Sequence, residues 1–396
     1  MHRFTRVIAA VVPLVLALTA AGCAGGTTEA PPAVSVPTTA PPEPVPLTPD
    51  VAERAFGTYV TDEDVARAAG DERLALTWTS DGQSQLTAAE FREAAYDGDP
   101  VRRFVYGDPE LYVPKLEDDA YPQWFVASVD RSVLGERKSE RKVLMAFVLR
   151  SPSDHWKLAF ATVMHRKAEL PEVAIDDDGY AEALGSEDTS LLIRPRDVIG
   201  IHATVAAEGE GSVAAKVMKS SPVTSGLYKD AKRAKKKAKE DDLTYQVVYT
   251  ATPYPYFGLR TESGGGLIVY SLFRNTSLIA EEPGTPKPEI PEEVEHLLDG
   301  TVEGNQIDTS ATLHFAAYDP PRADEDGGEQ DGGEKDEGEQ DGGGQGGEQG
   351  GGREDADEGD GGRAGGKKGD GQEKAHVIAD EEAISKAATP PLKEQP

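Results

Sequence analysis

The feature that most restricts how this chain can fold is a segment with almost no apolar side chains, residues 322–374. Glycine, glutamine and charged residues make up nearly all of it, with 18 acids, 7 bases and two copies of the hexapeptide GEQDGG. A segment with so little to bury and so much net charge is predicted to be disordered. The chain of 396 residues can therefore build a core only before residue 322 and after residue 374.

Residues 1–22 have the composition of an export signal. A basic start precedes the apolar run VIAAVVPLVLALTA, which is too short for a comfortable membrane span. Small residues then lead to Cys23, the single cysteine of the chain. This arrangement resembles the bacterial lipobox, although Ala20 stands where that motif most often has leucine. The resemblance implies cleavage between Gly22 and Cys23 and transfer of diacylglycerol to the Cys23 thiol.

A lipid on Cys23 places the protein at the cell membrane, on the extracytoplasmic face. The alternative is that Cys23 belongs to a secretory peptide that is discarded. An unpaired cysteine in an oxidising compartment is a liability unless it is modified, which favours the anchor. Residues 23–47 are rich in proline and threonine and are predicted to form a semi-extended tether.

The sequence pattern of residues 48–174 predicts helices followed by strands. Helix-start signals occur at Thr48 and at Thr61, and a third helix is expected over 86–98, with a threonine cap and a glycine stop. Aromatic and β-branched residues then predict four extended runs. These runs are RFVYGDPELYVP, PQWFVASVDR, RKVLMAFVLR and HWKLAFATVMHR.

Residues 175–321 repeat this order, with expected helices at 194–209 and 224–241 and a hairpin across Ser263–Gly266. A strand near Thr312 is expected to pair with one near His376 around the acidic insertion, so that 375–396 hold a terminal strand and a tail. The pattern predicts the α+β class, in two domains of helices and antiparallel sheet that look like nuclear-transport-factor-2-like or cystatin-like folds.

A search for catalytic motifs finds little. The chain has no zinc-protease helix, no GxSxG elbow and no phosphate-binding glycine loop. The run Ser139–Lys142 matches SxxK, but it falls between two expected strands and has no companion KTG, so a charged turn is the better interpretation. We therefore expect no enzyme, no cofactor and no metal.

Six residues of the first half suggest an alternative. A wrapped sheet could bring an acid, a histidine and aromatic rings into one pocket, as in isomerases and dehydratases of such folds. The simpler interpretation is that the rings belong to the core and the histidines to strand edges. The residues are Tyr106, Trp124, Asp130, His155, Trp156 and His165.

The sequence KDAKRAKKKAKE, residues 229–240, is a dense basic run in a chain of net charge −30. The bases are expected around the whole circumference of a helix whose apolar side is mostly alanine, which disfavours insertion into a membrane. An exposed helix is the simpler interpretation, and docking onto anionic headgroups or a phosphate-bearing wall polymer is the alternative. We expect no nucleic-acid partner. The candidate binding residues are Lys232, Arg233, Lys235, Lys236, Lys237 and Lys239.

Two stretches, TPDVAERAFGTYVTDEDVARAAGD and IDDDGYAEAL, carry a family resemblance. Over roughly residues 48–321 and the last strand, the chain resembles exported lipoproteins of high-GC Gram-positive bacteria that share a domain of unknown function. That resemblance implies no catalytic residues. The expected function is a non-catalytic binding or scaffolding lipoprotein of the cell envelope, whose partner is an envelope protein or an anionic polymer. The alternative is a pocket-bearing protein that acts on a small envelope molecule.

Overall fold

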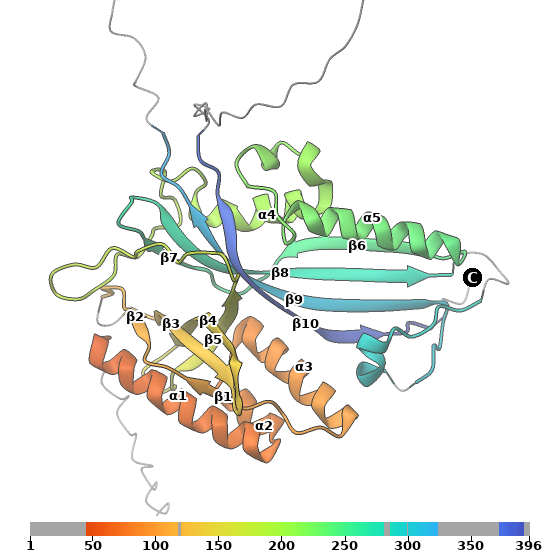
Figure 1. The fold of residues 1–396 in the computed structure, drawn as a ribbon, viewed down its shortest axis with the longest axis horizontal. Coiled ribbons are helices and arrows are strands. Elements are labelled where there is room, and N and C mark those ends of the chain that lie inside the picture. The colour runs from red at the N-terminus through yellow and green to blue at the C-terminus, as the bar shows by residue number, and fades with distance from the viewer. Residues whose placement is uncertain (1–44, 118–119, 281–285, 299, 324–371, 392–396) are drawn as a thin grey trace, which may run out of the picture. The chain divides into compact units, whose positions relative to one another are not determined.

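Strands whose residues are mostly buried along continuous runs, such as β5 (Lys157–Met164) and β9 (Gln306–Asp319), associate into one antiparallel sheet that is covered on both faces (Figure 1). The computed structural model describes residues 45–117, 120–280, 286–298, 300–323 and 372–391, all of which belong to one compact unit. The predicted signal peptide, Cys23 and most of the tether lie outside the described residues, and so does most of the acidic insertion. The mixed helix and antiparallel sheet architecture confirms the α+β class.

The helices before and between the strands have clear boundaries. Those of the first half are α1 (Pro49–Ala69), α2 (Glu72–Thr77) and α3 (Asp81–Asp97). Those of the second half are α4 (Val198–Glu208) and α5 (Ser225–Glu240), with short 3₁₀ turns η1 (Pro195–Asp197), η2 (Gly209–Gly211), η3 (Ala214–Lys216) and η4 (Glu292–Leu297). None of the described helices is both long enough and apolar enough to cross a membrane.

The strands run in the spatial order β1-β3-β4-β5-β10-β9-β8-β6, with β2 beside β3 and β7 beside β8. Their bounds are β1 (Phe104–Tyr106), β2 (Glu110–Tyr112), β3 (Gln123–Val133), β4 (Glu136–Leu149) and β5 (Lys157–Met164) in the first half. In the second half they are β6 (Thr244–Ala251), β7 (Phe257–Arg260), β8 (Gly266–Ile279), β9 (Gln306–Asp319) and β10 (His376–Ala388).

Strand β10 joins the two halves of the sheet. It pairs with β9 from the His376–Tyr318 pair onward, which confirms that the acidic segment is inserted between paired strands. Its other edge pairs with β5, where Asp380 lies opposite Val163. The boundary expected at residue 174 therefore does not separate two sheets, because β10 supplies hydrogen bonds to strands on both sides of it.

The helices cover opposite faces of this sheet. On β9, the ring of His314 lies against α3, where a Cβ added to Gly82 would meet the His314 Nε2 at 2.3 Å. The neighbouring side chains Leu313 and Phe315 point the other way and pack in the core of α4. Because side chains alternate along a strand, α3 and α4 lie on opposite faces, as Figure 1 shows.

Two helix boundaries differ from the expectation. Helix α1 runs through Thr61 without a break, and the Thr61 hydroxyl donates to the carbonyl of Gly57 inside the helix at 2.9 Å instead of capping a new one. Buried Tyr59 and Ala66 lie on either side of this point, and their burial keeps the helix continuous. Helix α3 begins at Asp81, several residues before the expected start, but it ends at left-handed Gly98 as predicted.

The segment expected to link two domains, residues 169–189, packs on the sheet. Val173 forms a bridge with Thr261, and Ala183 forms one with Leu259 of β7. Val173 is also buried in a core cluster that draws side chains from both halves of the sheet. This segment is therefore part of the fold and not a loose connection.

Candidate functional site: the basic helix and a charged cavity

Helix α5 is held on the protein by a narrow strip of side chains. Its buried residues are Ser225, Leu227, Ala231 and Ala238, which face α4 and β6. The spacings of four and seven from Leu227 to Ala231 and from Ala231 to Ala238 place these three residues on one side of the helix, while Ser225 is buried at its start. The expectation that the bases surround the helix is wrong, because they occupy only the remaining, outward side.

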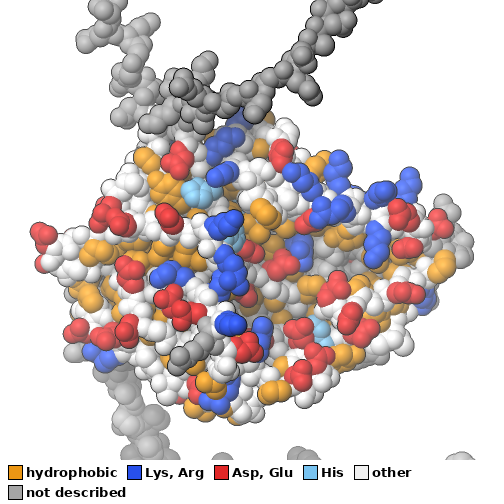
Figure 2. All heavy atoms as spheres, in the orientation of Figure 1, with side chains coloured by type: hydrophobic (Ala, Val, Ile, Leu, Met, Phe, Trp, Pro, Cys, Tyr) orange, Lys and Arg blue, Asp and Glu red, His pale blue; other side chains and the backbone are white. Residues whose placement is uncertain are grey.

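All six predicted bases of α5 are exposed, and Figure 2 shows lysine and arginine side chains gathered over this helix. Arg233 forms an ion pair with Asp230, and Lys236 lies 3.9 Å from Glu240. Exposed pairs of this kind contribute little to stability. The other four bases have no carboxylate partner among the described residues: Lys232, Lys235, Lys237 and Lys239.

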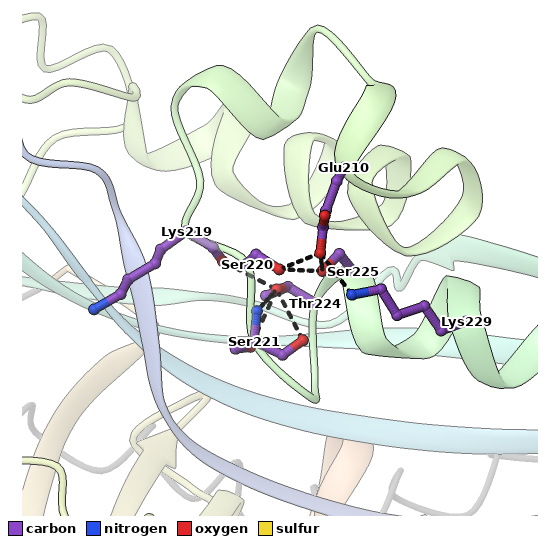
Figure 3. Close-up of polar contacts among 7 residues, drawn as sticks. All are labelled: Glu210, Lys219, Ser220, Ser221, Thr224, Ser225 and Lys229. Atoms are coloured by element: carbon purple, nitrogen blue, oxygen red, sulfur yellow. Dashed lines mark hydrogen bonds and ion pairs between the residues drawn. The ribbon is translucent and has the colours of Figure 1, made fainter. Parts of the chain in front are cut away.

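A polar network fixes the first turn of α5 (Figure 3). The Glu210 carboxylate accepts hydrogen bonds from Lys229 at 2.6 Å, Ser220 at 2.8 Å and Ser225 at 3.3 Å. The hydrogen bond from Lys229, followed by that from Ser220, lowers the pKa of Glu210 below its usual range. The Thr224 hydroxyl donates to the carbonyl of Lys219 at 3.0 Å, while the Lys219 side chain points away. These hydroxyls hold the start of the helix in place.

The aromatic residues proposed for a pocket do not converge. Tyr106 and Trp156 pack in the core beside α1, where the Tyr106 hydroxyl donates to Glu63 at 2.7 Å. Trp124 packs against Phe257 in the separate core cluster on the other face of β3. A shared ligand cannot contact both groups through the sheet.

The polar residues of that proposal are also dispersed. The His165 Nε2 lies 2.6 Å from an Asp380 carboxylate oxygen, at the junction of β5 and β10. The His155 Nε2 contacts the carbonyl of Thr77 at 2.8 Å. Asp130 is an exposed residue of β3 and lies 3.8 Å from Lys142. The structure therefore does not assemble the predicted acid, histidine and aromatic site.

The SxxK residues lie on strand β4 and not at a helix start. The Ser139 hydroxyl donates to the carbonyl of Glu136 at 2.6 Å and accepts from the backbone amide of Val133 at 2.8 Å. It thus fixes the turn between β3 and β4.

A cavity of about 480 Å³ that the sequence did not predict lies between α3, β10 and η4 and is floored by β3, β4 and β5. Charged side chains from six elements line it, among them Arg67, Glu90, Arg131, Arg141 and Glu381. Such a volume suits a small molecule. No three carboxylate or imidazole groups in the described part of the chain are close enough together to hold a metal ion.

Arg67 forms the rigid inner wall of the cavity and is only 6% exposed. Its guanidinium lies 2.9 Å from both Glu63 and Glu90, and it stands 4.5 Å from the centre of the Phe104 ring. Burial lowers the pKa of Arg67, but Glu63 and Glu90 more than offset this, so the pKa is raised overall and the side chain stays charged. This part of the wall is electrostatically satisfied.

On the other side of the cavity, the charged side chains have fewer partners of opposite charge. Arg131 and Arg141 lie directly opposite each other on β3 and β4. Arg131 stacks 4.3 Å from the Phe104 ring, and Arg141 donates to the carbonyl of Met164. Burial raises the pKa of Glu381, and Arg131 acts in the opposite direction. The pairing of the two arginines depends on a register shift between Arg131 and Val133, so the short turn between their strands would not have located this wall.

Fold and sites together define an α+β protein with a single antiparallel sheet, a basic outer helix and a charged cavity. The chain belongs to the family described as a domain of unknown function (DUF8094), whose profile matches residues 43–330. This confirms the resemblance to actinobacterial lipoproteins that share an uncharacterised domain.

Three uncharacterised lipoproteins of Streptomyces are similar to the chain. One from Streptomyces avermitilis is 25% identical over 55% of this chain and 63% of its own length. Two from Streptomyces coelicolor are 25% identical over 67% of this chain and 77% of the relative, and 28% identical over 45% and 50%. The chain thus spans less than two thirds of the first of these relatives. No solved structure matches the chain, so the likeness to nuclear-transport-factor-2-like or cystatin-like folds stays a prediction.

Proposed function

We propose that this protein is a lipoprotein of the cell membrane, anchored through diacylglycerol on Cys23, whose folded part binds an anionic envelope polymer without catalysis. The names of the Streptomyces relatives and the lipobox-like sequence that ends at Cys23 support the anchor. The single observation that supports the binding role is the row of outward lysines on α5 that have no carboxylate partner among the described residues.

A phosphate-bearing wall polymer fits α5 better than lipid headgroups do. The apolar side of α5 faces the protein, so no apolar surface is left on this helix to enter a bilayer. If residues 24–44 form the semi-extended tether that their composition predicts, they would span up to about 65 Å and carry the folded part away from the headgroups. Attraction at the scale of about 1 kcal/mol per exposed base suits a repeating phosphate.

The anchor is tested by intact-mass spectrometry and cell fractionation of a Cys23→Ala variant. We expect this variant to lack the diacylglycerol mass and to leave the membrane fraction, while a Thr27→Ala control keeps both. A membrane-bound Cys23→Ala protein would contradict the anchor. Cross-linking mass spectrometry on native membranes then shows whether an envelope protein is a partner as well.

The binding role is tested by sedimenting the full-length protein with purified cell walls. A variant with Lys232, Lys235, Lys237 and Lys239 changed to Gln is expected to bind several-fold more weakly and to lose most of its salt dependence. The control removes four exposed lysines elsewhere, Lys115, Lys138, Lys167 and Lys386, with the same change in net charge. Equal binding by the two variants would overturn the role of α5, and binding to anionic vesicles alone would assign it to headgroups.

A further inference from the structure

The two facing arginines of the cavity mark a position for an anion. Arg131 and Arg141 are cross-strand partners, and like charges at such positions repel each other and destabilise a sheet. Neither forms an ion pair with a carboxylate among the described residues, although both line the cavity. A carboxylate between them would accept from both guanidinium forks and relieve the repulsion.

The cavity is also lined by acceptors that lack a donor. Gln83 is 9% exposed, and its amide nitrogen donates to Thr87, but its Oε1 has no hydrogen-bond partner within the described structure. The Glu381 carboxylate also makes no hydrogen bond or ion pair among the residues described. A buried acceptor without a donor is destabilising, and a ligand ammonium group would supply several donors at once.

A ligand that carries only a negative or only a positive charge would not satisfy both the arginines and the acceptors. An anion would leave the Gln83 and Glu381 oxygens without donors, and a cation would leave the arginines facing each other. The volume of about 480 Å³ fits an amino acid or a short peptide. We propose that this cavity binds a small zwitterion, with its carboxylate at Arg131 and Arg141 and its ammonium group at Gln83 and Glu381. The site is independent of the lipid anchor and of α5.

Isothermal titration calorimetry on the full-length protein in detergent micelles tests the ligand class. Glycylglycine is the probe, N-acetylglycylglycine lacks the ammonium group, and glycylglycinamide lacks the carboxylate. We expect glycylglycine to bind and each derivative to bind at least about tenfold more weakly. Equal binding of glycylglycine and its acetylated form, or no heat from glycylglycine at about 10 mM, which is weaker than a typical specific site, would overturn the proposal.

Substitutions locate the binding site. Arg131→Gln, Arg141→Gln and Glu381→Gln are each expected to weaken glycylglycine binding at least about tenfold. Arg166→Gln removes an exposed arginine outside the cavity and should leave binding unchanged. The α5 variant with four lysines replaced should also bind normally, which separates this site from polymer binding. Unchanged binding in Arg131→Gln and Arg141→Gln would overturn the assignment.

A measurement on the unaltered protein covers the case in which a variant fails to fold. Phenylglyoxal modifies accessible arginines, and peptide mass spectrometry reports each position. Glycylglycine should slow modification of Arg131 and Arg141 but not that of Arg166. If glycylglycine changes the modification rate of none of these three arginines, the proposal is contradicted.

Discussion

At the scale of single residues, burial moves three titratable groups in opposite directions. It raises the pKa of Asp319 to about 7, although a hydrogen bond from the backbone amide of Ile193 acts against it. It lowers the pKa of both His202 and His314 to about 4. Each histidine donates one ring hydrogen to a backbone carbonyl, so the neutral ring is the form that the core accommodates.

These shifts predict how stability depends on pH. The folded Asp319 carboxyl holds its proton between about pH 4 and pH 7, where an unfolded carboxyl has lost it, so its contribution to stability falls as the pH rises through this range. The histidines act the other way: the unfolded rings bind protons below about pH 6.5 and the folded ones do not, so their contribution rises from about pH 4 to pH 6.5. The contributions partly cancel.

Asp319→Asn should remove the contribution to stability that falls as the pH rises. The free energy of unfolding of this variant is expected to rise more steeply with pH than that of the wild type, by up to about 1.4 kcal/mol per pH unit between pH 4.5 and 6.5. Urea unfolding at several pH values measures this. The asparagine can still accept the hydrogen bond from Ile193. Parallel pH curves for the two proteins would show that Asp319 titrates normally.

Gly82→Ala is expected to destabilise the protein by about 1–3 kcal/mol, because the added methyl would overlap the buried His314 ring. The matched control is Gly57→Ala in the exposed middle of α1, where nothing lies within 4 Å of the new Cβ. That change should instead stabilise by about 0.5–1 kcal/mol through helix propensity. Thermal unfolding of both variants decides the point, and a stabilised Gly82→Ala would mean that the helix and the ring can move apart.

At the scale of elements, two threonines with similar sequence signals behave differently. The Thr48 hydroxyl accepts from the backbone amide of Val51 at 3.2 Å and caps α1, whereas Thr61 lies inside the helix. Thr48→Ala should therefore lower stability by about 1 kcal/mol. Thr61→Ala should be neutral or slightly stabilising, since alanine has the higher helix propensity. Urea titrations of both variants test this, and equal losses would contradict a continuous α1.

The strands were predictable because their signal is local. Runs of β-branched and aromatic residues between turn residues located the strands of the first half and the hairpin across Ser263–Gly266. The continuity of α1 was not predictable, because a threonine followed by an acid indicates a cap unless tertiary burial overrides it. The side of α5 occupied by its bases depends on which few apolar residues are buried, and only the sheet beneath decides that.

The cavity could not be derived in the same way. Its wall combines Arg67 and Gln83 from helices with Arg131, Arg141 and Glu381 from three strands. Glu381 joins this wall only because β10 returns to the sheet from far along the sequence. The sequence suggested the aromatic and histidine residues as an alternative site because they are chemically conspicuous, and alternation along the strands places the aromatic rings on different faces.

At the scale of the whole molecule, the acidic insertion is expected to be dispensable for folding. Residues 320–375 connect two strands that are already paired at His376 and Tyr318. Replacing residues 324–371 with a short glycine-serine linker shortens the loop and should raise the free energy of unfolding by about 1–2 kcal/mol.

Calorimetry of the shortened protein checks this expectation. A chain that stops at Lys374 is the control, because it lacks β10 and should lose cooperative unfolding. If the shortened protein unfolds at a lower temperature than the wild type, the insertion contributes contacts to the fold and the prediction is wrong.

Strand β10 follows every other described element in the sequence but occupies the interior of the sheet. During synthesis, β5 and β9 therefore cannot pair with β10 until the residues from His376 onward have been made. Contacts between such distant segments form slowly. For a chain exported as proposed, the late synthesis of β10 would leave the sheet incomplete while the polypeptide crosses the membrane. The timing of the final strand would thus protect the chain from folding on the wrong side.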